Sequence, residues 1–184
     1  MDDAAAIPAI AELVEQHAPL LYRYAYRLCG HAADAEDFTQ QTFLVAQERQ
    51  SQLRSAEHAR GWLCTILRNL YLKSCRHRPP QSLDPHSLEG EPESRPAAAP
   101  PPGDIDQQQL QAALQELPEA FRTPLILFYF EEFSYQEIAE QLSVPLGTVM
   151  SRLARGKAHL KQRLTAAESL PATRAQRLSS AGIG

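Results

Sequence analysis

The residues of this chain best suited to binding chemistry lie on one predicted helix, from about Leu146 to Leu164. At about 100° per residue, positions i, i+3, i+4, i+7 and i+11 share one face of a helix. Hydroxyl, arginine and histidine side chains occupy these positions: Thr148, Ser151, Arg152, Arg155 and His159. Hydroxyls and a helix N-terminus can hold phosphates, and arginines can read guanine edges with two hydrogen bonds. The pattern therefore favours contact with DNA in a major groove.

A solvated helix is the plainer alternative, because cations near a helix C-terminus are favoured by the helix dipole. It accounts for Lys161 and Arg163, and poorly for Arg152, which lies in the first half of the predicted helix. The opposite side of this helix carries apolar residues that we expect to face a core: Val149, Leu153, Leu160 and Leu164.

The segment before this helix predicts a partner for it. Ser134 followed three residues later by Glu137 is a capping box, which marks the start of a helix. Ile138, Ala139 and Leu142 give that short helix an apolar side, and "SVPLG" interrupts it. Two helices joined by a short turn, the second of them basic, predict a helix-turn-helix.

A second basic helix is predicted from about Gly61 to His77, in the stretch "GWLCTILRNLYLKSCRHR", which holds no acidic residue. The cations of this segment, with one just before it, are Arg60, Arg68, Lys73, Arg76 and Arg78. Trp62, Ile66 and Leu70 have the spacing of a core-facing side, so we expect Trp62 to pack and not to stack on a base. A second basic helix in a separate block is unusual for a simple helix-turn-helix repressor.

The stretch "DAEDFTQQTFLVAQE" belongs to a helix predicted from about Ala33 to Gln50, capped by Asp34 or a neighbour. One side of this helix is polar, with Asp37, Gln40, Gln41 and Glu48. Another side carries Phe38, Thr42 and Val45. A solvated polar face accounts for the pattern, and this segment by itself identifies no partner.

The composition bounds the class of protein. With 184 residues the chain is long enough for one domain or two small ones. Its net charge of −4 implies no bulk attraction to nucleic acid, so a polyanion site must come from local clustering. No apolar run approaches the roughly 20 residues that span a bilayer, and the acidic start lacks a signal-peptide core. Three cysteines, an odd number, fit free thiols, and we expect a cytoplasmic protein without membrane insertion.

Catalysis is not predicted. Cys64, Cys75 and His77 match no zinc spacing, and a buried free thiol is the usual role of such a cysteine. No cluster of carboxylates and no glycine-rich phosphate loop supports an enzyme such as a metal hydrolase. We therefore expect no metal, no cofactor and no catalytic residue.

A proline-rich acidic segment, Pro79 to Gln109, divides the chain. It holds eight of the 14 prolines and six acidic residues against one arginine. Such a segment cannot bury enough apolar surface to offset its ordering entropy, so it predicts a flexible linker. The blocks on both sides have helical patterns without alternating strands, and the sequence predicts an all-α protein of two small helical domains.

Further helices are expected in both blocks. They run from Ile7 to Cys29 with a bend near Pro19, from Asp106 to Leu117, and from Pro118 or Glu119 through "AFRTPLILFYFEE". The apolar run Leu125–Phe130 alone could be a buried strand, but its flanks favour a helix.

Together these segments resemble an extracytoplasmic-function sigma factor of bacterial RNA polymerase, in the sigma-70 family, over about Leu13 to Leu164. "DAEDFTQQTF", "GWLCTILRNLYLKSCRHR" and the whole stretch from "LPEAFRTPL" to "RGKAHL" resemble the family's motifs. The resemblance implies four segments: region 2 over residues 1–78, a linker over 79–109, region 4 over 110–164 and a tail over 165–184 without an assigned role. It implies a protein that directs polymerase to promoters and promotes DNA melting.

The resemblance also implies roles for single residues. Asp37, Gln40 and Gln41 would dock on the clamp helices of the largest polymerase subunit, and region 4 would meet the flap of the second subunit. The residues expected at −10 DNA are Arg60, Arg68, Asn69, Lys73 and Arg76, with Asn69 helping to hold a flipped base. The residues expected at −35 DNA are Thr148, Ser151, Arg152, Arg155 and Lys157. An anti-sigma factor is an expected further partner.

Three positions depart from the family pattern. Gln41 stands where an acidic residue is usual, and Ser74 stands near a common aspartate. Met150 replaces a usual arginine or lysine, which removes one expected DNA contact and bears on the −35 preference. The alternative function is an autonomous helix-turn-helix regulator, which accounts for Ser134 to Leu164 and leaves the first block unexplained.

Overall fold

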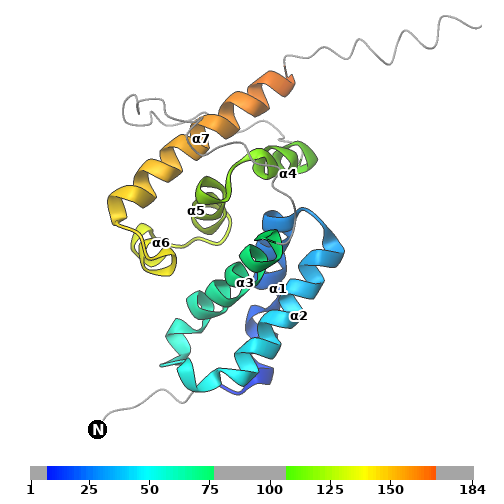
Figure 1. Cartoon of the computed structure of the whole chain (residues 1–184), viewed down its shortest axis with the longest axis vertical. Coiled ribbons are helices and arrows are strands. Elements are labelled where there is room, and N and C mark those ends of the chain that lie inside the picture. Colours follow the sequence, from blue (N-terminus) through cyan, green and yellow to red (C-terminus); the bar gives the residue numbers. More distant parts are fainter. Residues whose placement is uncertain (1–7, 77–106, 169–184) are drawn as a thin grey trace, which may run out of the picture.

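The computed structural model describes residues 8–76 and 107–168, and within these ranges the regular structure is helical, without a strand. The first group comprises α1 (Ile10–Cys29), α2 (Ala32–Glu48) and α3 (Ala59–Arg76), with the short 3-10 turns η1 (Gln50–Gln52) and η2 (Ala56–His58) between α2 and α3. The second group comprises α4 (Gln107–Glu116), α5 (Glu119–Tyr129), α6 (Tyr135–Leu142) and α7 (Leu146–Glu168). Figure 1 shows the second group above the first, and the predicted all-α fold is confirmed. The proline-rich linker and most of the predicted tail lie outside the described residues.

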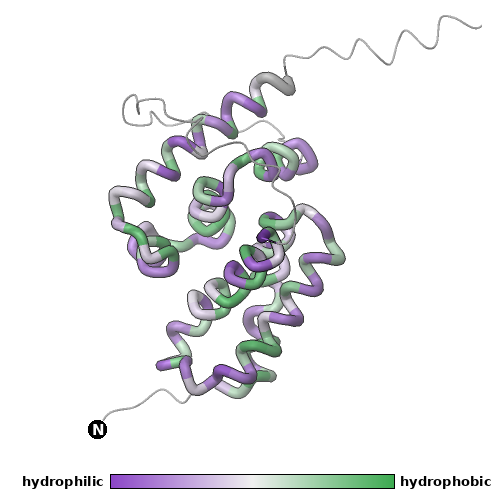
Figure 2. The backbone as a smooth tube through the Cα atoms, viewed as in Figure 1, coloured by the Kyte–Doolittle hydropathy of each residue, from purple (hydrophilic) through white to green (hydrophobic). Residues whose placement is uncertain are grey.

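The first group is held together by one apolar side of each helix. Leu21, Tyr24 and Leu28 of α1 are fully buried, as are Leu63 and Leu67 of α3. Figure 2 shows hydrophobic and hydrophilic residues alternating along the helices, as expected for helices with one buried side. The expected helix from Ile7 to Cys29 is α1, with Pro19 inside it.

The end of α1 is a glycine turn. Gly30 has a φ of 81°, in the left-handed region that glycine adopts without a steric penalty, and its N–H donates to the carbonyl of Tyr26. α2 begins at Ala32, close to the expected start near Ala33, and its N-cap is His31, without a side-chain capping hydrogen bond. Asp34 lies in the first turn of α2, so the interpretation of Asp34 as the capping residue is wrong. A carboxylate in a first turn still favours a helix through the helix dipole.

The second group contains the helix-turn-helix expected from the sequence. The apolar run that begins at Leu125 is helical up to Tyr129, which confirms the helix interpretation over a strand. The capping box at the start of α6 is also confirmed: the N–H of Glu137 donates to Ser134 Oγ (3.2 Å), and the N–H of Ser134 donates to Glu137 Oε2 (2.7 Å). Ser143, with a φ of 52°, ends α6 before the turn.

The two groups share one apolar core. Leu28 and Tyr71 of the first group and Leu114, Phe121 and Ile126 of the second belong to the same cluster of buried residues. α1 contacts both α4 and α5, and α3 contacts α6. The described part of the chain is therefore compact, and the basic helix α3 lies beside the second group.

Candidate nucleic-acid interface

The helix-turn-helix consists of α6 and α7. Val149 and Leu153 of α7 are 0% and 6% exposed, and they face the core together with Ile138 of α6. The N–H of Val144 donates to the carbonyl of Ala139 (3.0 Å), which fixes the turn between the two helices. This packing leaves the side of α7 away from Val149 and Leu153 available for another molecule.

The five residues predicted to read −35 DNA lie on the first half of α7 and are all half-buried: Thr148, Ser151, Arg152, Arg155 and Lys157. Ser151 Oγ donates to the carbonyl of Thr148 (3.0 Å), so its lone pairs remain available to a donor. Arg155 Nε is buried without a hydrogen-bond partner among the described residues. Thr148, Arg152 and Arg155 share one flank of α7, as the spacing predicts.

The most exposed residues of this half of α7 are different ones. Leu146 is 49% exposed and Met150 52% exposed, and Gly147 and Ala154 are exposed as well. The sequence marked Met150 only as a lost contact, and Leu146, Gly147 and Ala154 were missed because their side chains are apolar or absent. The signal that could have found them is their position, away from the buried Val149 and Leu153 at a helical period of 3.6.

A glycine sets the depth at which α7 packs on α5. A Cβ atom at Gly156 would lie 2.6 Å from Leu125 Cδ1 and 3.2 Å from Leu125 Cγ. A larger residue at this position would therefore displace the Leu125 side chain or move α7 away from α5.

The basic residues of α3 divide into two sets. The guanidinium of Arg60 lies over the ring of Phe133, 4.1 Å from its centre, and Arg68 Nε donates to Glu119 Oε1 at 2.9 Å. Phe133 and Glu119 both belong to the second helix group. In contrast, Asn69, Lys73 and Arg76 are exposed. Two of the residues predicted to bind −10 DNA, Arg60 and Arg68, therefore contact the second helix group. The other three are exposed to solvent.

Side chains of the second group also donate hydrogen bonds to the carbonyls at the C-terminal end of α1. The last carbonyls of a helix have no partner within it. Gln111 Nε2 donates to the carbonyl of Tyr26 (3.1 Å), and Gln115 Nε2 donates to that of Arg27 (3.0 Å). Arg122 Nη1 donates to the carbonyl of Leu28 at 2.8 Å.

Arg122 is the centre of this network. Its buried guanidinium also donates to Tyr71 Oη (3.0 Å), Gln115 Oε1 (2.9 Å) and the carbonyl of Leu117 (2.8 Å). Burial raises the pKa of the Tyr71 hydroxyl to about 12, so Tyr71 stays neutral at physiological pH and accepts the hydrogen bond as a phenol. Arg122 thus joins α1, α3 and α5.

A buried carboxylate faces the first group at the same interface. The Glu131 side chain is fully buried, and its Oε2 accepts a hydrogen bond from Arg23 Nη2 at 3.4 Å. Burial raises the pKa of Glu131, while Arg23 opposes the shift. Nearby, the Arg27 guanidinium lies 3.7 Å from the centre of the Phe130 ring, and burial lowers its pKa.

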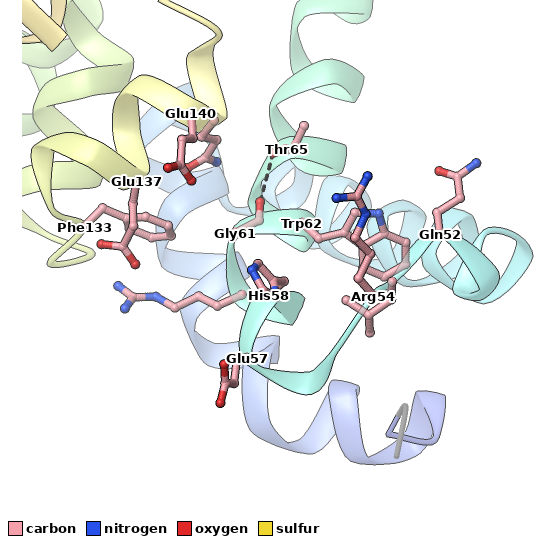
Figure 3. Close-up of a pocket in the computed structure, with 13 residues that line it drawn as sticks. Gln52, Arg54, Glu57, His58, Gly61, Trp62, Thr65, Phe133, Glu137 and Glu140 are labelled. Carbon is pink, nitrogen blue, oxygen red and sulfur yellow. Dashed lines mark hydrogen bonds between the residues drawn. The ribbon is translucent and has the colours of Figure 1, made fainter. Parts of the chain in front are cut away.

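A cavity of about 450 Å³ separates α6 from the segment that precedes α3 (Figure 3). Its walls come from both helix groups. The side chains of Glu57, His58 and Trp62 form one wall, and those of Glu137 and Glu140 lie opposite. Hydrogen bonds from Ser134 lower the pKa of Glu137, so this wall carries negative charge at neutral pH. The segment that precedes α3 therefore faces carboxylates of the second group.

The predicted polymerase-binding residues Asp37, Gln40 and Gln41 are exposed on α2. A second cavity, of about 400 Å³, brings Asp37 and Gln41 beside Lys73 of α3. The structure thus places one predicted −10 residue next to two predicted polymerase-binding residues.

Comparison with known families matches both helix groups. Residues 13–79 match Sigma-70 region 2, and residues 107–160 match Sigma-70, region 4. The chain is 41% identical over 167 residues to the ECF RNA polymerase sigma factor SigE of Mycolicibacterium smegmatis, over 88% of this chain and 64% of that protein. It is 35% identical over 159 residues to the sigma factor SigL of Mycobacterium tuberculosis, over 82% of this chain and 85% of that protein. The chain belongs to the ECF sigma factors of the sigma-70 family.

As a sigma factor, the chain is a transcription initiation factor and not an enzyme. Helices α1–α3 form region 2, and α4–α7 form the DNA-binding region 4. The chain spans just under two thirds of the length of SigE of Mycolicibacterium smegmatis. No helix within residues 8–76 and 107–168 is long and apolar enough to cross a membrane.

Two solved structures share the fold. The sigma factor RpoE of Bartonella quintana, in complex with the anti-sigma factor NepR, matches with a TM-score of 0.67 and 26% identity, over 84% of this chain and 96% of that one. CnrH, in complex with the cytosolic domain of CnrY, matches with a TM-score of 0.63 and 22% identity, over 85% of this chain and 88% of that one.

The three cysteines of the sigma factor differ in exposure: Cys64 is buried, Cys29 half-buried and Cys75 exposed. Burial raises the pKa of the Cys64 thiol to about 12, so it stays protonated and unreactive at neutral pH. Within the described ranges, no three histidine, cysteine or acidic side chains are grouped to hold a metal ion. His77 and Arg78 lie outside those ranges.

Proposed function

We propose that this sigma factor binds core RNA polymerase, directs it to promoters through −10 and −35 elements, and promotes melting of the DNA. The observation that carries the proposal is the presence of two basic helices in one chain, α3 in region 2 and α7 in the helix-turn-helix of region 4. A single DNA-binding module has no use for the first of them. Polymerase would supply most of the binding energy, which is consistent with a net charge of −4.

We assign the duplex contact at −35 to region 4, through Thr148, Ser151, Arg152, Arg155 and Lys157. Flipped bases of the −10 strand would be captured by region 2, with Asn69, Lys73 and Arg76 exposed for this role and Arg60 and Arg68 joining them. Unstacking a base costs a few kcal/mol, which capture in a pocket offsets. A linker joining two binding sites increases affinity only when its span fits, so the segment 79–109 would set the preferred −10 to −35 spacing.

Polymerase binding is assigned to the exposed side of α2. Asp37, Gln40 and Gln41 would meet the clamp helices of the largest subunit, and region 4 would meet the flap of the second subunit. Since the work of the protein is on the chromosome, we place it in the cytoplasm, without membrane insertion.

We infer that regions 2 and 4 separate on the polymerase, because in the compact arrangement region 4 occupies residues assigned to −10 DNA. The contacts of Arg60 with Phe133 and of Arg68 with Glu119 compete with binding of these arginines to −10 DNA. The carboxylates of Glu137 and Glu140, across the cavity from the segment that precedes α3, would also repel phosphates of DNA bound there. We therefore propose that core polymerase selects an open arrangement in which these contacts are broken.

Control by an anti-sigma factor is part of the proposal. The sigma factor RpoE of Bartonella quintana, which is 26% identical to this chain, was solved in complex with the anti-sigma factor NepR. An anti-sigma factor that prefers the compact arrangement would hold this chain away from polymerase.

The test is reconstitution of the purified chain with core polymerase, followed by mapping of transcript starts. We expect site-specific initiation with polymerase and little specific DNA binding by the chain alone. A tight operator complex formed by the chain alone, without initiation, would instead establish an autonomous helix-turn-helix regulator. In the reconstituted system, Asn69→Ala should impair open-complex formation, followed by permanganate reactivity of unpaired thymines, more than it impairs polymerase pull-down. Failed pull-down with intact melting would contradict the role of Asn69.

A further inference from the structure

The first three turns of α7 present an apolar row to solvent. Leu146, Met150 and Ala154 stand four residues apart, so they lie on one side of the helix. Met150 is 52% exposed and Leu146 49% exposed, and Ala154 is exposed as well. The buried residues Val149 and Leu153 already supply the apolar side that packs on the core. The exposed row therefore has no packing role in the fold of region 4.

The surroundings of the row indicate what covers it. At about 100° per residue, Ser151 and Arg155 lie about 60° and 100° around the helix from Ala154, and so border the row, whereas Arg152 lies on the far flank of α7. A Cβ atom at Gly147 would have nothing within 4 Å, so the backbone there is open to close approach. Hydroxyls and guanidinium groups around an apolar row suit the major groove, where phosphates and polar base edges surround the methyl group of thymine.

We propose that Met150, with Ala154, reads thymine methyl groups in the −35 element. This inference rests on the proposed function of region 4. Thymine alone among the four bases presents a methyl group in the major groove, and apolar side chains recognise it. Four residues of helix rise about 6 Å, close to two base-pair steps of about 3.4 Å. The two side chains can therefore meet thymines that lie within a few base pairs of each other.

Methionine is suited to this contact because its unbranched thioether side chain adapts to irregular apolar surfaces. An arginine or lysine at position 150 would instead seek a guanine edge or a phosphate. Met150 therefore shifts the preference of this sigma factor toward A·T pairs at the base pair that it meets.

Deoxyuridine, which lacks only the methyl group of thymine, tests the proposal directly. Transcript mapping with the reconstituted holoenzyme identifies a promoter, and each thymine of its −35 element is replaced in turn by deoxyuridine. We expect the wild-type holoenzyme to lose about fourfold in promoter binding at each contacted thymine, the equivalent of about 0.8 kcal/mol per buried methyl-sized group. The variant Met150→Gln, of similar length and polar, should bind the thymine and deoxyuridine templates equally at one of these positions.

Two controls separate this contact from a general loss of binding. Arg152→Ala should weaken binding to the thymine and deoxyuridine templates by the same factor. Deoxyuridine placed between the −35 and −10 elements should have no effect. Because Met150 is exposed, Met150→Gln should also unfold at the temperature of the wild type, which circular dichroism checks.

Equal binding of the wild type to thymine and deoxyuridine at every −35 position overturns the proposal, as does a −35 element without thymine. A Met150→Gln variant that keeps the full discrimination overturns it as well. If Met150→Gln lowers polymerase affinity and leaves thymine discrimination unchanged, the row is a protein contact and the proposal is wrong. Initiation without methyl discrimination leaves the proposed function intact, whereas the absence of sigma-dependent initiation contradicts the proposed function itself.

Discussion

The two basic helices of this sigma factor are held in different ways. In region 2, Arg60 and Arg68 of α3 are engaged by an aromatic ring and a carboxylate of region 4. In region 4, the first turns of α7 point their exposed residues to solvent. The compact arrangement therefore engages two −10 residues in contacts with region 4. The five residues proposed to read duplex DNA are half-buried, on the same half of α7 as the exposed Met150. The difference indicates that promoter melting, more than duplex reading, depends on separating the regions.

The largest effect is expected from the residue that joins the two regions. Arg122→Met keeps the length of the side chain and removes a buried guanidinium that donates to Leu28, Tyr71 and Leu117. Several buried acceptors then lose their donor, at a cost of about 3 kcal/mol in the free energy of unfolding. Urea unfolding of the purified chain measures the loss, and an energy-transfer pair on α2 and α7 reports separation of the regions.

Arg163→Met is the matched control for that experiment. Arg163 pairs with Glu116, and both residues belong to region 4 at exposed positions. We expect little change in stability and none in the distance between the regions. Equal losses in the two variants would show that Arg122 has no special role at the interface.

The variant Arg152→Ala tests whether Arg152 reads bases of the −35 duplex. If Arg152 makes a bidentate base contact, the variant should lose roughly 1–3 kcal/mol of transition-state stabilisation on promoters with a matching −35 element. Initiation rates from a panel of −35 sequences measure this. The same loss on every −35 sequence would assign Arg152 to a phosphate and remove it from base reading.

The variant Glu119→Gln tests whether the ion pair with Glu119 limits binding of DNA by Arg68 of α3. This change removes the charge that holds Arg68 Nε at 2.9 Å in a partly exposed pair, which is worth about 1 kcal/mol or less. The freed Arg68 should raise the affinity of the chain for a −10 single-stranded oligonucleotide by a few-fold, measured by fluorescence anisotropy. Glu116→Gln breaks an ion pair within region 4 and should leave that affinity unchanged, so a rise in both variants would reflect net charge alone.

The smallest effect concerns pH. Burial raises the pKa of Glu131, which means that the packed arrangement favours the protonated carboxyl. This stabilising contribution is present below the ordinary pKa range of a carboxyl and is lost as the pH rises through the raised value. The stability of the chain should therefore fall slightly over this window, and Glu131→Gln should flatten the profile, measured as the unfolding midpoint against pH. A midpoint that rises with pH in the same window would show that pairing with Arg23 outweighs burial.

Local patterns predicted the elements well, because their causes are local. The capping box of Ser134 and Glu137 needs only a spacing of three residues, and the apolar side of α7 needs only its period. The interface could not be predicted in this way. Arg122 reaches partners that lie 94 and 51 residues away in the sequence, and these distances span the linker. Nothing local to "AFRTPL" marks its arginine as buried, so its role emerges only from the packing of both regions.

The binding residues were predicted unevenly for a related reason. The sequence marks arginines on a helix as contact candidates but does not show that Arg68 is engaged by Glu119. It also directs attention to charged side chains, so the exposed row of Leu146, Met150 and Ala154 was assigned no common role before the structure showed its exposure. Expectations for residues 79–106 and 169–184 stay predictions.

The close approach at Gly156 defines a unit that could be exchanged between sigma factors. Gly156 lets α7 pack closely on α5. The residues before Gly156 are therefore held at a set distance from α5. A graft of positions 146–155 from a relative that also has glycine here should transfer its promoter preference without redesign of the core. A donor with a larger residue at this position would need Leu125 exchanged along with it.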